Sequence, residues 1–172
     1  FLKKSVVKTA AGGSAANTIS SLAALGLKCS FIGNRRNDHF GKIFSKSMKD
    51  EGINLINKEK KEGLSSSTCL VMVSPKGERT MCTYLGASIE FEPKDIDFNI
   101  LEETKYLYLE GYLWDSTLAK NAFLNAAQIA KKSNTKIILS LSDSFCVDRH
   151  RESFLELIDK YVDIVFCNES EM

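Results

Sequence analysis

The sequence has little that would mark a membrane-bound or nucleic-acid-binding protein. Its 172 residues contain no apolar run that approaches the roughly 20 residues of a membrane-spanning helix. Lysine and arginine total 23 against 22 acidic residues, so the net charge of +1 lacks the positive excess that nucleic acids and anionic membranes attract. We therefore expect no nucleic-acid partner and no membrane partner.

The sequence also lacks the cysteine pattern of a secreted or zinc-binding protein. Its 5 cysteines are odd in number, and no two form a CxxC pair. Four of them lie inside apolar runs, where we expect free thiols to be buried like small hydrophobic groups. The 2 histidines are far apart and form no zinc-ligand pattern. These features predict a reducing, cytoplasmic compartment and no disulfides. The cysteines are Cys29, Cys69, Cys82, Cys146 and Cys167.

The length and the two ends of the chain bear on its domain organisation. A chain of 172 residues with 44% hydrophobic residues suits one domain or a large part of one. The opening stretch, FLKKSVVKTAAGG, has no initiator methionine and no signal-peptide pattern. We therefore expect residues 1–172 to be one piece of a single, longer domain, cut at both ends.

Strand and helix patterns alternate along most of the chain and indicate an α/β fold. Gly26 ends the first predicted helix, and Asp38 caps a second helix with Phe40, Ile43, Phe44 and Met48 inward. Such alternation predicts a doubly wound, mainly parallel sheet with helices on both faces. The predicted helices cover residues 14–25, 39–51, 118–131 and 152–161, and the predicted strands cover 27–32, 53–56, 106–109, 137–141 and 164–167.

Residues 68–85 predict a β-hairpin attached to the main sheet. Two runs of β-forming residues flank the turn sequence SPKGE, and their alternation suits a ribbon covered on one face. A two-stranded ribbon is marginally stable unless something covers it, so it could close over a ligand or pair with a partner's ribbon. An edge hairpin packed on its own domain fits the residues equally well.

The segment GGSAANT is the first candidate binding element. Gly12 and Gly13 let a ligand approach the backbone, and Asn17 can both donate to and accept from a hydroxyl group. This chemistry suits a polyol better than a phosphate. The segment matches neither GxGxxG nor the GK[ST] of a phosphate-binding loop. A plain glycine turn that enters a tightly packed helix is the alternative interpretation.

Two more candidates lie where predicted strands end. Ligands of open α/β sheets bind beyond the carboxyl ends of strands, which is where Glu110 lies. The alternative for Glu110 is a solvated loop carboxylate. Asn168, Glu169 and Glu171 follow the last strand, and such oxygen ligands suit Mg²⁺. A capping box, with Asn168 as the cap and Glu171 three residues later, is compatible with that role.

The order of these features resembles the ribokinase-like (PfkB) carbohydrate kinase family. GGSAANTISSLAALG is similar to its first signature, and IGNRRNDHFG resembles its G-x-x-G-x-D-x-x-G segment, with Gly33, Asp38 and Gly41 retained and Arg36 in place of a glycine. The stretch from Thr68 to Ser88 resembles the lid hairpin of adenosine and sugar kinases. NESE matches the family's N-x-x-E motif. The resemblance covers nearly the whole chain.

The resemblance implies an ATP-dependent kinase that phosphorylates a hydroxymethyl group of a sugar or nucleoside. Gly12, Gly13, Asn17 and Glu110 would bind the substrate's hydroxyl groups. Asn168 and Glu171 would organise ATP and Mg²⁺, with Glu171 acting on the metal through water. The hairpin, at about residues 64–90, would be the lid, and in many relatives it also forms a dimer contact.

The family's catalytic aspartate, in a G-A-G-D motif late in the chain, has no counterpart in these residues. The resemblance therefore implies a kinase in the parent protein and an inactive fragment, with no catalytic residue within this chain. A non-catalytic binding or dimerisation module of the same fold is the alternative. A generic doubly wound nucleotide binder is a third possibility, but no dinucleotide fingerprint follows a predicted strand.

Overall fold

The structure, a computed structural model, describes residues 8–172. Residues 1–7, which belong to the predicted domain and to the stretch without a signal-peptide pattern, lie outside the described residues. The helices are α1 (Ser14–Ala24), α2 (His39–Asp50), α3 (Asn99–Glu102), α4 (Thr117–Lys132) and α5 (Ser144–Tyr161). The strands are β1 (Ser30–Phe31), β2 (Asn54–Leu55), β3 (Thr68–Val73), β4 (Arg79–Tyr84), β5 (Tyr106–Glu110), β6 (Lys136–Ser140) and β7 (Ile164–Phe166). The 3₁₀ helices are η1 (Gly86–Glu90), η2 (Pro93–Asp95) and η3 (Gly111–Asp115).

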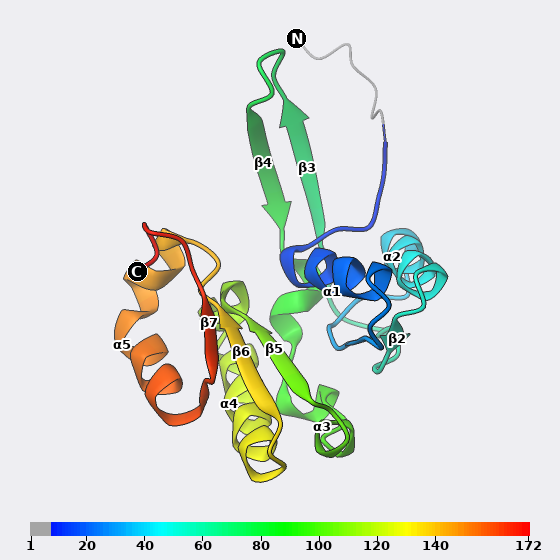
Figure 1. Cartoon of the computed structure of the whole chain (residues 1–172). Coiled ribbons are helices and arrows are strands. Elements are labelled where there is room, and N and C mark those ends of the chain that lie inside the picture. The colour runs from blue at the N-terminus through cyan, green and yellow to red at the C-terminus, as the bar shows by residue number, and fades with distance from the viewer. Residues whose placement is uncertain (1–7) are drawn as a thin grey trace.

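The main sheet has three parallel strands in the order β5–β6–β7. Leu109 of β5 pairs with Leu139 of β6, which pairs in turn with Val165 of β7. Helix α4 connects the first two strands and α5 connects the last two (Figure 1). The predicted parallel α/β architecture is confirmed.

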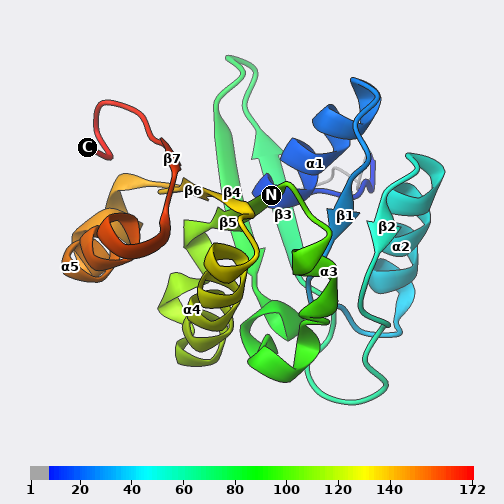
Figure 2. The ribbon, with the colours of Figure 1, turned by 60° about the horizontal axis from the view of Figure 1, so that its bottom comes forward.

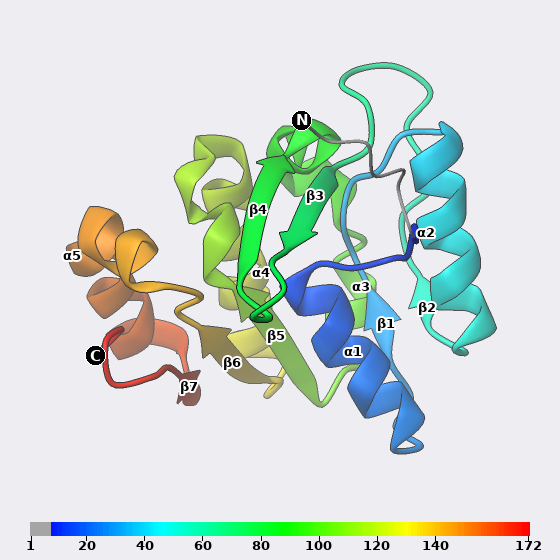
Figure 3. The ribbon, with the colours of Figure 1, turned by 90° about the horizontal axis from the view of Figure 1, so that it is seen from above.

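Helices lie on both sides of this sheet. Helices α4 and α5 pack against each other and share one hydrophobic core with alternate residues of the strands. Helix α1 contacts β5 from the other side, as the views in Figures 2 and 3 show. Trp114 and Phe154 lie at the centre of the core with their ring centroids 5.2 Å apart. The residues predicted to face inward from α4 are all buried: Ala119, Ala122, Phe123, Ala126, Ala127 and Ala130.

A smaller unit packs beside the main sheet. Strands β1 and β2 pair in parallel and, with α1 and α2, enclose a core of Ala16, Met48 and Ile53. Both strands are shorter than predicted, with two residues each. The prediction that Phe40 faces inward is wrong, because the buried stripe of α2 runs through Gly41, Ser45 and Met48 and leaves Phe40 45% exposed.

The predicted hairpin is present and projects from the body of the protein (Figure 1). Strands β3 and β4 are antiparallel, with Val71 opposite Met81. The expectation that one face would be covered is wrong, because nearly every residue of both strands is exposed. Its large exposed apolar side chains are Leu70, Val71, Met72, Val73, Met81 and Tyr84.

Helix α5 begins earlier than predicted. It starts at Ser144 instead of Glu152, because the carboxylate of Asp143 accepts a hydrogen bond from the backbone N–H of Cys146 at 2.6 Å and caps the helix there. The backbone leaves helical geometry at His150, which divides the helix into two halves. The apolar pattern of the sequence indicated only the second half.

The cysteines differ from the expectation of buried thiols. Cys146 is fully buried, and burial raises the pKa of its thiol to about 11. Cys69 and Cys82 are exposed because both faces of the hairpin are open, and Cys167 is exposed just after the edge strand β7.

Among residues 8–172, no helix is long and apolar enough to cross a membrane.

Candidate functional site

The amino end of α1 presents the glycine pair and Asn17. Gly13 has φ of 113°, a conformation that favours glycine, and a Cβ added to Gly12 would meet no protein atom within 4 Å. The backbone N–H of Asn17 donates to the carbonyl of Gly13 at 2.8 Å, which closes the first helical turn. The Asn17 side chain is exposed. The backbone here is open to a ligand.

Glu110 ends β5 with a buried and hydrogen-bonded carboxylate. It is 7% exposed and accepts hydrogen bonds from the Tyr108 hydroxyl at 3.1 Å and from the Ser142 hydroxyl at 2.5 Å. A solvated loop carboxylate, the alternative interpretation, is therefore wrong. One donor from β5 itself and one from the loop after β6 hold this acidic group in one orientation.

The backbone around Glu110 has little room. A Cβ on Gly111 would lie 2.8 Å from the carbonyl oxygen of Ser140 and 2.9 Å from that of Leu141. Ser142 has φ of 75°, which is strained for a residue with a side chain and recurs at functional sites. Its hydroxyl also accepts from the backbone N–H of Tyr112 at 3.1 Å. The loop after β6 is thus fitted closely around the end of β5.

The aromatic hydroxyl groups of this region have raised pKa values. Burial raises the pKa of Tyr112, and the negative charges of Asp143, Glu110 and Glu171 raise it further. The pKa of Tyr108 is raised by burial first and also by Glu110, although the polar groups of Ser140 and Thr18 lower it. Both phenols therefore stay protonated and act as hydrogen-bond donors.

Helix α1 faces the side of β5 that carries these groups. Tyr108 and Glu110 are two residues apart on one strand and point to the same face, and α1, which includes Thr18, packs against β5. Asn17 precedes Thr18, so the structure brings the amino end of α1 to the same side of the sheet as Glu110. Within the described residues, no hydrogen bond joins Asn17 to Glu110 directly.

The NESE segment forms a compact turn after β7. The Asn168 side chain donates to one Glu171 oxygen at 2.6 Å, and its backbone N–H donates to the other at 3.2 Å. The backbone N–H of Glu171 donates to the Asn168 side-chain oxygen at 3.1 Å. These reciprocal bonds are those of a capping box, which confirms that interpretation of the pair. Glu171 is 8% exposed.

This turn fits a metal only indirectly. In the part of the chain that the structure describes, no three histidine, cysteine or acidic side chains lie together as a metal site. Both Glu171 oxygens already accept hydrogen bonds from Asn168. Their remaining lone pairs suit contacts with metal-bound water, and Mg²⁺ in proteins commonly keeps several waters.

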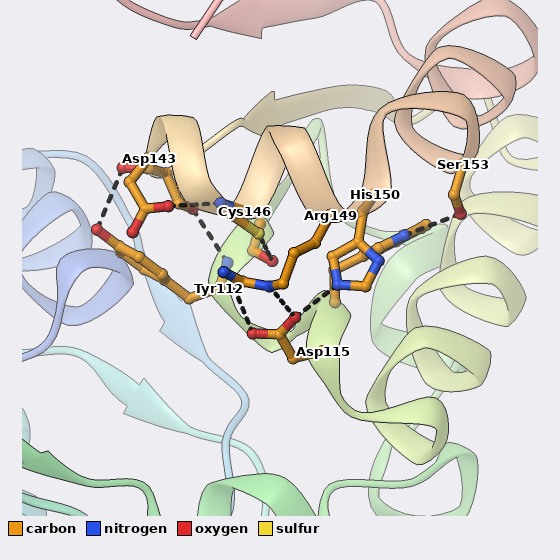
Figure 4. A network of polar contacts seen from close by, with 10 residues as sticks. Tyr112, Asp115, Asp143, Cys146, Arg149, His150 and Ser153 are labelled. Atoms are coloured by element: carbon orange, nitrogen blue, oxygen red, sulfur yellow. Dashed lines mark hydrogen bonds and ion pairs between the residues drawn. The ribbon is translucent and has the colours of Figure 1, made fainter.

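A network of hydrogen bonds and ion pairs connects η3 to the first half of α5 (Figure 4). Arg149 donates two hydrogen bonds to Asp115, at 3.0 and 2.7 Å, and His150 lies 2.5 Å from the same carboxylate. The Cys146 thiol donates to the carbonyl of Gly111 at 3.3 Å. Because η3 follows Glu110 directly, this network stabilises the position of the β5 end.

The sequence did not indicate three contributors to this region: Tyr108, Tyr112 and Ser142. The spacing of Tyr108 two residues before Glu110 is a signal that could have found the first, because such residues share a face of a strand. Ser142 and Tyr112 are joined by contacts across 30 residues of chain, which no local pattern reports.

Comparisons with known proteins show which proteins share this sequence and fold. A probable sugar kinase from Rhizobium etli is 42% identical with a TM-score of 0.88, and the match covers 93% of this chain and 49% of that one. The adenosine kinase from Sinorhizobium meliloti is 40% identical, with the same TM-score and the same coverage. A 5-dehydro-2-deoxygluconokinase from Clostridium perfringens is 32% identical over 166 residues, which are 93% of this chain and 49% of the relative.

The chain thus spans about half the length of these relatives. The sequence profile that describes the pfkB family carbohydrate kinases matches residues 3–172, nearly the whole chain. The predicted resemblance to that family is therefore confirmed. The chain belongs to the pfkB family of carbohydrate kinases.

Proposed function

We propose that the protein, at its full natural length, is an ATP-dependent kinase that phosphorylates a hydroxymethyl group of a sugar or nucleoside. The observation that carries this proposal is Glu110, a buried carboxylate held by Tyr108 and Ser142 at the end of β5. An acceptor held in one orientation suits a substrate hydroxyl group, and Asn17 with the open backbone of Gly12 and Gly13 would bind others.

Asn168 and Glu171 would act on the nucleotide side of the site. Bound Mg²⁺ would neutralise the phosphate charges of ATP, and Glu171 would orient waters on that ion. The contribution of this chain is positioning and charge, because phosphoryl transfer needs little covalent chemistry from the protein. We propose the hairpin at about residues 64–90 as the lid that excludes water from the substrate.

The relatives are named for different substrates, so the substrate of this protein has to be identified by experiment. A coupled ADP-release assay on the full-length protein, with adenosine, ribose, fructose and 5-dehydro-2-deoxygluconate, should show turnover with one of them well above the background rate. Activity should require Mg²⁺ and fall on removal of the metal by a chelator. The absence of substrate-dependent turnover with all four would contradict the proposed function.

We expect the 172-residue chain by itself to show no transfer in the same assay, since the family's catalytic aspartate has no counterpart in it. Addition of the remaining half in trans should restore some activity if the halves dock. Turnover by the chain alone would place the catalytic base within it, and Asp143 would be the first residue to test.

We place the protein in the cytoplasm.

A non-catalytic binding or dimerisation module is the second candidate function. It is favoured by one observation, the apolar side chains exposed on both faces of the hairpin. Analytical ultracentrifugation of the full-length protein, with and without Val71→Glu, distinguishes the cases. A dimer that the substitution dissociates, in a protein without kinase activity, would favour the module.

A further inference from the structure

The hairpin has few contacts that could determine its direction. Nearly every residue of its strands is exposed, so its orientation depends on its base, where the chain enters at residues 65–67 and leaves at residues 85–88. The Ala87 N–H donates to the Ser65 carbonyl at 2.8 Å, and the Ser67 hydroxyl donates to the Leu85 carbonyl. These bonds join the two legs of the hairpin to each other, but not to the rest of the protein.

Asp38 connects the incoming leg to the body of the protein, while the outgoing leg reaches the body through the packing of η1 on α4. One of its carboxylate oxygens accepts from the backbone N–H of Gly41 at 2.8 Å and caps α2. The other accepts from the backbone N–H of Ser66, also at 2.8 Å, two residues before β3 begins. One side chain thus bonds both to a helix of the body and to the incoming leg of the hairpin.

Ser66 is enclosed at this point. It is 4% exposed, and its hydroxyl accepts from the backbone N–H of Arg36 at 3.0 Å. A Cβ on Gly41 would collide with the Arg36 carbonyl oxygen and lie 2.8 Å from the Ser66 hydroxyl oxygen. A Cβ on Gly86, which has φ of 48°, would collide with the Ser65 carbonyl oxygen. The incoming leg is therefore packed tightly against the segment before α2, and the outgoing leg is packed tightly against the incoming leg.

We propose that Asp38 is a positioning residue that sets the orientation of the β3–β4 hairpin relative to the body of the protein. It does so by holding Ser66 to the capped amino end of α2. The consequence for catalysis, namely that Asp38 determines how the hairpin closes over a bound substrate, rests on the proposed function. Asp38 lies in the retained G-x-x-G-x-D-x-x-G-like segment, and its role as a helix cap accounts for only one of its two bonds.

The ionisation of Asp38 agrees with this role. Burial raises the pKa of its carboxyl group, but hydrogen bonds from Ser66 and Gly41 and the charge of Arg36 outweigh burial, and the pKa is lower than usual. The carboxylate stays charged at neutral pH, so both of its oxygens are available as acceptors. A neutral amide in its place has a single acceptor oxygen.

Asp38→Asn should keep the hydrogen bond that caps α2 and remove the one to Ser66. Asparagine is as good a helix cap as aspartate, so α2 should keep its cap, while the amide nitrogen cannot accept from the Ser66 N–H. Asp50→Asn is the matched control, since it removes the same charge from an exposed position at the other end of α2. Hydrogen–deuterium exchange of the full-length proteins, without substrate, measures the effect.

We expect exchange at residues 66–73 and 79–86 to be several-fold faster in Asp38→Asn than in Asp50→Asn, with α2 equally protected in both variants. In an active enzyme, Asp38→Asn should also raise the KM for the sugar or nucleoside more than the KM for ATP, and should increase ATP hydrolysis without transfer. Hairpin exchange equal in the two variants would overturn the proposal.

A second variant covers the case in which Asp38→Asn does not fold. Gly86→Ala disturbs the base of the hairpin from the outgoing leg, because its methyl group would collide with the Ser65 carbonyl oxygen, and it leaves Asp38 in place. It should give the same exchange pattern. Unchanged hairpin exchange in a folded Gly86→Ala protein would overturn the proposal as well. Faster hairpin exchange in an Asp38→Asn protein whose wild type has no kinase activity on any substrate would support the role of Asp38 in positioning the hairpin. It would count against the proposed function alone.

Discussion

The hydroxyl group of Ser142 donates a hydrogen bond of 2.5 Å to the carboxylate of Glu110, across 32 residues of chain. This bond joins the end of β5 to the loop that follows β6. The same hydroxyl accepts from the backbone N–H of Tyr112, so one side chain satisfies two groups at the candidate substrate site.

Ser142→Ala should therefore lower the stability of the protein. It leaves the Tyr112 N–H without this partner and Glu110 with one donor fewer, and the cost should be about 1–3 kcal/mol in the free energy of unfolding. Urea denaturation measures the change. Ser144→Ala, a change to a hydroxyl outside this network, is the control, and an equal loss in both variants would contradict the prediction.

Asn17→Ala should weaken binding of the sugar or nucleoside and leave stability nearly unchanged. The side chain is exposed and contributes little to the core, while each hydroxyl contact it loses should cost on the order of 1 kcal/mol. Isothermal titration calorimetry on the full-length protein measures the affinity. Asn121→Ala, at an exposed position early in α4, is the control. Unchanged affinity in a folded Asn17→Ala protein would remove Asn17 from the site.

Gly12→Ala tests whether a ligand approaches the glycine pair. An added methyl group meets no protein atom within 4 Å, so the melting temperature should not fall. If the substrate packs against this backbone, its affinity should fall at least tenfold. Gly111→Ala provides the contrast, because its methyl group would press on the carbonyl oxygens of Ser140 and Leu141 and should lower the melting temperature. Full affinity in Gly12→Ala would mean that the ligand binds elsewhere.

Asp115 should make stability depend on pH in the acid range. Hydrogen bonds from Arg149 outweigh partial burial, and with a further contribution from His150 they lower the pKa of its carboxyl group. A lowered pKa in the folded state stabilises the protein above the unfolded pKa of about 4, and this contribution disappears as the pH falls through the folded value. Urea unfolding of the wild type and Asp115→Asn at several pH values measures it.

The difference in unfolding free energy between these two proteins should be largest near neutral pH and should shrink toward zero in acid. Asp148→Asn, which removes an exposed carboxylate from α5, is the control and should show a smaller difference. A difference that stays constant down to the lowest pH would show that the ion pair with Arg149 does not stabilise the fold.

Much of the fold could be predicted from short-range patterns. The inward face of α4 and the β3–β4 hairpin follow from side-chain spacing and turn residues within a few positions of each other. The start of α5 and the exposure of Phe40 could not be predicted this way. The start of α5 depends on the Asp143 cap, which apolar spacing does not report, and the exposure of Phe40 depends on which face of α2 packs against its neighbours.

The parallel α/β architecture, the family and the turn of Asn168 and Glu171 could be predicted from the sequence, because they depend on local periodicity and on motifs of a few residues. The burial of Glu110 between Tyr108 and Ser142 and the bond of Asp38 to Ser66 became visible in the folded structure alone. These contacts join residues that are far apart along the chain. Ser142 and Ser66 reach their partners across 32 and 28 residues, and such contacts form only when separate elements pack together.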